Sequence, residues 1–200
     1  MPHQEPFLVQ SAMPSGCLAL IVLLPLFAAI GVVRGDTGVI SVGPIRLPRT
    51  IGSYQAVEAI NDDIKRPGLG YTINYASYDS KASVFIYSDG MAIVPEDINT
   101  LIFRSHFVKI CDVIMTLDPS ARSLSTTRKI KIGGKYAWHR VYGYVDKGRE
   151  VISHVYLGSM RGKYLKIRIT DFTNRRCLHI QDDKCHMDFL RTVFEALSEH

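Results

Sequence analysis

The chain has 200 residues, of which 46% are apolar, and its 24 Lys+Arg outnumber 19 Asp+Glu to give a net charge of +5. This composition excludes a disordered chain and a collagen-like repeat, and four cysteines are too few for a dense disulfide scaffold. Only one apolar run is long, which excludes a polytopic membrane protein.

That apolar run occupies residues 17–33 (CLALIVLLPLFAAIGVV) and contains no charged residue. Its length lies between the ~7–15 residues of a signal-peptide core and the ~20 of a spanning helix. Small residues at signal-peptidase spacing end at Gly35, so we expect residues 1–35 to be a signal peptide cleaved there. The first basic residue, Arg34, follows the run, which leaves an uncleaved N-terminal anchor as the alternative. Residues 36–200 are expected to form a single domain.

The first part of this domain is expected to be mainly extended. Period-two alternation of apolar residues is typical of a half-buried strand, and Pro and Gly mark the ends of such runs. The segments are 38–48 as a short strand or extended arm, 53–61 as either helix or strand, and 69–76 and 82–88 as strands.

Two segments show helical periodicity instead. Residues 97–117 are expected to form a long helix capped by Asp97, and residues 186–198 a C-terminal helix. The apolar stripe of the first contains Phe103, Phe107, Ile110, Cys111, Ile114 and Leu117, and that of the second Met187, Leu190, Val193, Phe194 and Leu197.

Four runs with strand character lie between the helices, joined by short glycine-containing turns. They are residues 124–132, 136–145, 151–157 and 163–171. The order of strands, long helix, four-strand meander and terminal helix predicts an α+β fold. In it, one long central helix and a C-terminal helix pack on an antiparallel sheet.

This order, together with Gly68-Leu69-Gly70-Tyr71 before ASVFIYSDG and the later HVYLGSMRGKYLKIRITDF, resembles the PsbP-like fold. The photosystem extrinsic proteins, the Ran-binding Mog proteins and the bacterial DcrB-type envelope proteins share that fold, and similar segments occur in exported bacterial proteins of unknown function. The resemblance covers about residues 40–198. It implies a binding or assembly role more than catalysis, and no catalytic residue set comes with it.

Motifs that carry chemistry are absent. The sequence has no P-loop, GxGxxG, HExxH, CxxC or GxSxG, so we expect no cofactor and assign no catalytic residue. In an oxidising compartment Cys177 and Cys185 are expected to form a disulfide, and we assign no metal ligands. The alternative is a metal site made by Cys177, His179, Asp182, Cys185 and His186, although this spacing matches no zinc pattern. Cys111 is expected to be a buried thiol.

Charge distribution is the strongest functional signal. Residues 122–176 contain 14 Lys+Arg against three acidic residues, whereas the segments on either side are acidic. If the aliphatic residues of the meander line one core, its other face presents basic and aromatic side chains together: Arg140, Tyr142, Tyr144, His154, Tyr156, Lys166 and Arg168. Such a face suits an anionic partner, although the same residues also fit plain packing beneath a helix or a solvated surface.

The sequence therefore predicts an exported, periplasmic or secreted cell-envelope protein with a non-catalytic binding or assembly role. Expected partners are anionic lipid, envelope polysaccharide or an acidic protein, and export argues against nucleic acid. Two alternatives are a hydrolase whose site is assembled in space, and an immunity or inhibitor protein for a secreted toxin.

Overall fold

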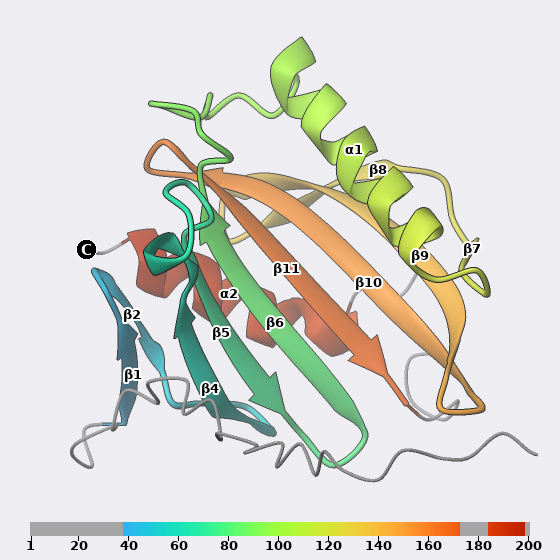
Figure 1. The fold of residues 1–200 in the computed structure, drawn as a ribbon. Coiled ribbons are helices and arrows are strands. Elements are labelled where there is room, and N and C mark those ends of the chain that lie inside the picture. Colours follow the sequence, from blue (N-terminus) through green and yellow to red (C-terminus); the bar gives the residue numbers. More distant parts are fainter. Residues whose placement is uncertain (1–37, 173–183, 199–200) are drawn as a thin grey trace, which may run out of the picture. The chain divides into compact units, whose positions relative to one another are not determined.

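The computed structural model describes residues 38–172 and 184–198 (Figure 1). Their core is one antiparallel sheet with the strand order β3-β4-β5-β6-β11-β10-β9-β7, in which β8 also pairs with β9. The strands are β3 (Thr50–Ile51), β4 (Tyr54–Asn61), β5 (Tyr71–Ala76), β6 (Ser80–Tyr87), β7 (Arg122–Ser123), β8 (Arg128–Ile132), β9 (Lys135–Asp146), β10 (Arg149–Met160) and β11 (Lys163–Asp171).

The first predicted strand is a hairpin. Residues 38–48 form β1 (Val39–Val42) and β2 (Ile45–Pro48), which pair with each other in a separate two-stranded sheet. The ambiguous segment 53–61 is strand β4, which pairs with both β3 and β5. A short 3₁₀ helix, Asp62–Ile64, then leads into the turn before β5.

The turn before β5 depends on Gly70. Its φ is +74°, a conformation that side-chain-bearing residues rarely adopt, and an added Cβ would collide with the carbonyl oxygen of Ile86. The amide of Gly70 also donates to the carboxylate of Asp63 at 2.7 Å. Only glycine lets the chain pass this close to β6.

Helix α1 (Leu101–Leu117) begins later than predicted, because the hydroxyl of Thr100 caps it by accepting from the Phe103 amide. The predicted cap, Asp97, instead accepts from the Asn99 amide in the preceding turn. Phe103, Phe107 and Cys111 are buried as expected, whereas Leu117 is 79% exposed.

The predicted meander is confirmed, with β8, β9, β10 and β11 pairing in chain order. Strand β11 also pairs with β6, so it joins the meander to the N-terminal strands in one sheet. The fold class is therefore α+β, as the sequence predicts.

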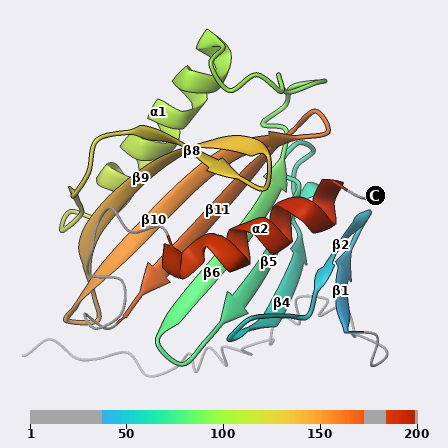
Figure 2. The same cartoon turned by 180° about the vertical axis from the view of Figure 1, so that it is seen from behind.

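The two helices contribute to different cores. Helix α2 (Lys184–Ser198) crosses the back of the sheet (Figure 2), and Leu190, Val193 and Phe194 are essentially inaccessible there. Helix α1 lies on the other side, where Phe103, Phe107 and Cys111 belong to a second buried cluster. Both faces of the sheet are thus buried, at least in part, and the side chains of its central strands point into one core or the other.

Candidate functional site

Five of the seven predicted binding residues share the sheet face beneath α1. Strand register places Val155 of β10 directly between Arg140 on β9 and Arg168 on β11. Opposite residues in an antiparallel pair lie on the same face, and residues two apart along a strand do so as well. The cationic face, defined as Arg140, Tyr142, Tyr144, Lys166 and Arg168, therefore comes from β9 and β11, on either side of β10.

The three cations of this face are held by aromatic rings and hydroxyls. The Lys166 ammonium lies 3.9 Å from the ring centre of Phe85. The Arg168 guanidinium lies 5.3 Å from the ring centre of Tyr144, and its Nε donates to the Ser153 hydroxyl at 2.8 Å. The Arg140 Nε donates to the Ser123 hydroxyl at 2.9 Å. None of the three forms an ion pair with an acidic side chain among the described residues.

Lys166 shows the electrostatic cost of this arrangement. Burial, and secondarily the neighbouring Arg168, lowers the pKa of its ammonium to about 8. The protonated form lacks a compensating anion, although the ring faces of Phe85 and Tyr87 provide weak stabilisation. An anion bound beside Lys166 would raise this pKa again.

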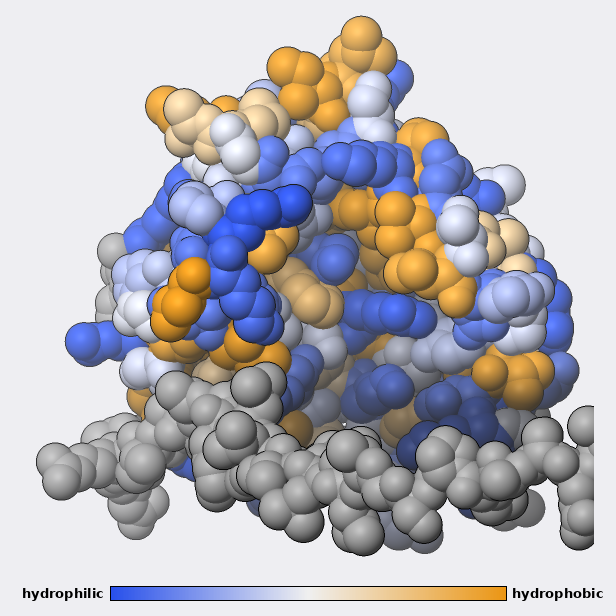
Figure 3. All heavy atoms as spheres, in the orientation of Figure 1, coloured by the Kyte–Doolittle hydropathy of each residue, from blue (hydrophilic) through white to orange (hydrophobic). Residues whose placement is uncertain are grey.

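A groove of about 230 Å³ opens beside the cationic face, between the end of α1 and the sheet. Its lining includes Arg168 and Tyr144 from the sheet, and Leu117 from α1. Lys81 also lines it and lies 3.7 Å from Asp146. Figure 3 looks onto this side of the molecule, where hydrophilic residues occupy the hollow beside α1 and hydrophobic residues gather on its rim.

His154 and Tyr156 do not belong to the cationic face. Register places them opposite Ile169 and Ile167, on the face covered by α2, and both are fully buried. The expected single aliphatic core is wrong for β10, because Val155 and Leu157 of that strand pack beneath α1 instead. Since both faces of the sheet are buried, aliphatic residues do not reveal which face a strand turns toward a given core.

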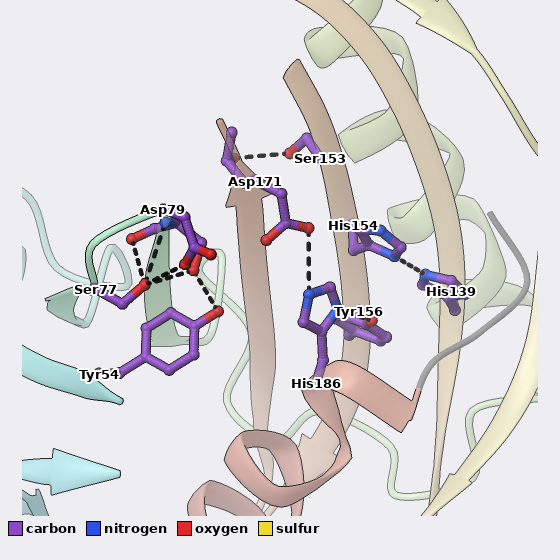
Figure 4. A network of polar contacts seen from close by, with 11 residues as sticks. Tyr54, Ser77, Asp79, His139, Ser153, His154, Tyr156, Asp171 and His186 are labelled. Atoms are coloured by element: carbon purple, nitrogen blue, oxygen red, sulfur yellow. Dashed lines mark hydrogen bonds and ion pairs between the residues drawn. The ribbon is translucent and has the colours of Figure 1, made fainter. Parts of the chain in front are cut away.

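His154 and Tyr156 belong instead to a buried polar cluster beneath α2 (Figure 4). His154 Nδ1 lies 3.2 Å from Nε2 of His139, and the Tyr156 hydroxyl lies 3.1 Å from Nδ1 of His186. His186 is at the start of α2, and its Nε2 lies 3.3 Å from Oδ2 of Asp171 on β11. Three neighbouring strands, β9, β10 and β11, and helix α2 thus bring three histidines, a tyrosine and a carboxylate together.

Three polar atoms of this cluster are buried without a hydrogen-bond partner among the described residues: His154 Nε2, Asp171 Oδ2 and His186 Nε2. Asp171 Oδ2 and His186 Nε2 are 3.3 Å apart, close enough for an ion pair, but they do not form a hydrogen bond with each other. Burial lowers the pKa of His154 to about 2 and that of His139 to about 3, so both imidazoles are neutral near pH 7.

Sequence reasoning missed this cluster, since it considered His186 only together with the cysteines before α2. Cys177, His179 and Asp182 lie outside the described residues, as does the side chain of Cys185. The Cys177–Cys185 disulfide therefore stays a prediction. Cys111 is a free, buried thiol, as expected.

A hydrolase site assembled in space would need a histidine beside a carboxylate and a hydroxyl. His154 does lie near Asp171, but the neighbouring Ser153 points to the other face, where its hydroxyl is 3.1 Å from that of Thr170. Within residues 38–172 and 184–198, no serine, threonine or cysteine is hydrogen-bonded to a histidine.

Comparison with known proteins gives distant structural likenesses only. No family model and no curated protein matches the chain. The PsbP protein CyanoP of Synechocystis is 15% identical, with a TM-score of 0.42, over 86% of this chain and 97% of that one. LpqN, described as involved in cell envelope biogenesis of Mycobacterium tuberculosis, is 10% identical, with a TM-score of 0.32, over 77% and 78% of the two chains.

A Pseudomonas aeruginosa protein of unknown function, described as a putative regulator, is 12% identical, with a TM-score of 0.37, over 74% of this chain and 86% of that one. The resemblance to PsbP-like proteins is thus confirmed as a distant one, and it carries no conclusion about binding or activity. Among the described residues, no helix has the length and apolar character needed to span a membrane.

Proposed function

We propose that this chain is an exported, non-catalytic protein of the cell envelope that binds an anionic lipid surface through the cationic face and α1. The observation that carries the proposal is the set of three cations, Arg140, Lys166 and Arg168, held over aromatic rings without an acidic partner among the described residues. The uncharged run at residues 17–33 supports export.

Fixed and unpaired cations favour anion binding for an electrostatic reason. Their side chains already occupy defined positions, so little rotamer freedom is lost when a phosphate or carboxylate approaches. The Nε of Arg168 donates to Ser153 and orients its guanidinium, a group suited to bidentate contacts with phosphate. Partial burial further strengthens the interaction, because the surrounding dielectric is lower than in water.

The outer surface of α1 favours a lipid surface over a soluble polymer or an acidic protein. Leu101 and Leu117, at the two ends of the helix, are 80% and 79% exposed. Ile102, Val108, Val113 and Met115 are exposed between them. Leu117 also lines the groove that contains Arg168. Apolar side chains beside cations are typical of surfaces that insert shallowly among anionic headgroups.

Vesicle co-sedimentation of the chain spanning residues 36–200 tests this proposal. We expect retention on phosphatidylglycerol vesicles but not on phosphatidylcholine vesicles. Charge reversal of the cationic face (Arg140→Glu, Lys166→Glu, Arg168→Glu) should abolish retention. If the reversed variant does not fold, neutralisation by Arg140→Gln, Lys166→Met and Arg168→Gln should weaken retention by at least about tenfold, since roughly 1 kcal/mol per cation is lost.

A matched control separates the cationic face from net charge. Arg46→Glu, Lys65→Glu and Arg66→Glu alter three exposed cations elsewhere and change the net charge by the same amount. Retention should persist in this control. Equal losses of vesicle retention in both variants would show that retention depends on net charge alone. Retention on an acidic polysaccharide in place of vesicles would show that the cationic face binds another partner. Either result contradicts the proposal.

A further inference from the structure

The buried polar cluster beneath α2 contains three potential metal ligands that converge on one point. His154, Asp171 and His186 each offer one ligand atom, and these atoms all lie within 4.8 Å of one another. The same three atoms, His154 Nε2, Asp171 Oδ2 and His186 Nε2, are buried without a hydrogen-bond partner in the part of the chain that the structure describes. Buried polar atoms are normally satisfied, so three convergent exceptions require an explanation.

A divalent transition metal would satisfy all three atoms at once. Zinc takes imidazole nitrogen and carboxylate oxygen at ~2.0–2.2 Å, which places ligand atoms of a tetrahedral site ~3.4 Å apart. His186 Nε2 and Asp171 Oδ2 are already 3.3 Å apart, so the remaining adjustment concerns His154. Two imidazoles in the set favour zinc or its neighbours over calcium and magnesium, which prefer oxygen ligands.

Each candidate histidine ligand is oriented through its other ring nitrogen, as metal-bound histidines usually are. His186 Nδ1 lies 3.1 Å from the Tyr156 hydroxyl, which accepts a hydrogen bond as readily as it donates one. His186 therefore has a partner for the tautomer that presents the Nε2 lone pair. His154 Nδ1 has its corresponding contact with His139.

Arg128 sets the tautomer of the His139–His154 pair. Its Nε donates to His139 Nδ1 at 3.2 Å, so the hydrogen of His139 is on Nε2 and points at His154 Nδ1. The hydrogen of His154 is then on Nε2, the atom that has to bind the metal. Metal binding therefore requires three proton shifts. The proton on His154 Nε2 leaves, the proton on His139 Nε2 moves to His154 Nδ1, and His139 takes up a proton on Nδ1. The proton count is unchanged, and the Arg128 Nε–H must turn away.

We infer that His154, Asp171 and His186 form a binding site for a divalent transition metal such as zinc, and that Arg128 opposes its loading. The three ligands come from β10, β11 and the first turns of α2, so the metal would join the helix to the sheet. His154 and His186 are almost inaccessible, whereas the Asp171 side chain is 14% exposed and marks the side open to solvent. A three-ligand site leaves a position for water.

Zinc titration of the untagged, metal-free chain by calorimetry tests the site, with cobalt(II) absorption as a second readout. We expect one zinc per chain and a cobalt spectrum of nitrogen and oxygen ligands. Asp171→Asn, which is nearly isosteric and should fold, and His154→Gln should each weaken zinc binding by at least about 100-fold. Arg128→Met should tighten it by about tenfold, because the Arg128 Nε–H then no longer donates to His139 Nδ1, the atom that has to take up the proton.

His106→Gln is the matched control, because His106 also lies near a carboxylate, 3.5 Å from Asp89, but on the opposite side of the sheet. Unchanged zinc affinity in this variant supports the assignment. The inference is overturned if the chain binds no zinc, or if Asp171→Asn and His154→Gln both bind it like the parent.

The cysteine-containing alternative before α2 shares His186 and is distinguished by its sulfur ligands. Cys177→Ser with Cys185→Ser should leave zinc affinity unchanged, and cobalt should show no thiolate charge-transfer band. Loss of binding in that double variant, with a thiolate band in the parent, would place the metal on the cysteines and overturn the inference. Vesicle retention is a separate readout, since the cationic face lies on the other side of the sheet.

Discussion

The two faces of the sheet are both covered by a helix, but they bury polar side chains to different extents. Beneath α2, the polar side chains of His139, His154 and Tyr156 are fully buried and contact one another. Beneath α1, the basic side chains of Lys166 and Arg168 are only half-buried. The helices differ in the same sense, since α1 has exposed leucines at both of its ends whereas the apolar stripe of α2 is covered.

This difference indicates a division of tasks between the faces. Full burial beneath α2 contributes hydrophobic stabilisation and keeps His139, His154 and Tyr156 away from bulk water. Partial burial beneath α1 leaves cations and apolar side chains accessible beside each other, at a cost in stability. The α2 face is therefore expected to be sensitive to changes of volume, and the α1 face to changes of charge.

The largest expected effect is on the α2 face. Phe194 is 1% exposed, so Phe194→Ala should lower the free energy of unfolding by about 3–5 kcal/mol through lost burial and the resulting cavity. Urea denaturation at neutral pH measures this. A loss below about 1 kcal/mol would show that α2 contributes little to the core and would remove the contrast between the faces.

The next effect concerns charge on the α1 face. Lys166 has a pKa of about 8 in the folded chain, against 10.5 ordinarily, so the unfolded chain binds more protons between these values. Stability should therefore rise as the pH increases from about 8 toward 10.5, by at most about 3 kcal/mol. Lys166→Met should be more stable than the parent near pH 7 and should lack this rise. Parallel pH profiles for the two proteins would contradict the burial of this charge.

A smaller effect tests the contact between β10 and α2. A Cβ added at Gly158 would lie 2.9 Å from the Phe194 ring, so Gly158→Ala should cost about 1–3 kcal/mol. Gly143 is a matched control on β9, because the nearest atoms to its added Cβ belong to the flexible Leu124 side chain, at 3.1 Å. In thermal unfolding, the melting temperature of Gly158→Ala should be lower than that of Gly143→Ala. The reverse order would contradict this packing of β10 against α2.

The smallest effect on stability is expected at the exposed residues of α1. Leu101→Ser and Leu117→Ser should change the free energy of unfolding by no more than about 0.5 kcal/mol, since neither side chain is buried. The same double variant should bind anionic vesicles more weakly. Strong destabilisation would mean that α1 is held through these residues, and unchanged retention would limit the lipid surface to the cations.

The candidate sites were predictable to different degrees. Alternation along β9 and β11 was enough to place Arg140 and Lys166 on one face, because side-chain direction within a strand has a period of two. The same alternation did not show which way His154 points, because β10 has apolar residues on both faces. Asp171 and His186 belong to different elements, so their proximity to His154 depends on how α2 docks on the sheet.

Local sequence patterns are enough to predict the class of the fold. Period-two runs, glycine turns and two helical stripes are local patterns, and they were sufficient for the meander and both helices. Capping by Thr100 and the hairpin within residues 38–48 were missed, because several residues there suit either role.

Three features could not be predicted from such patterns: β11 lies between β6 and β10, the helices cover opposite faces, and His154, Asp171 and His186 converge. These outcomes depend on packing between residues far apart in the chain, which local periodicity does not encode.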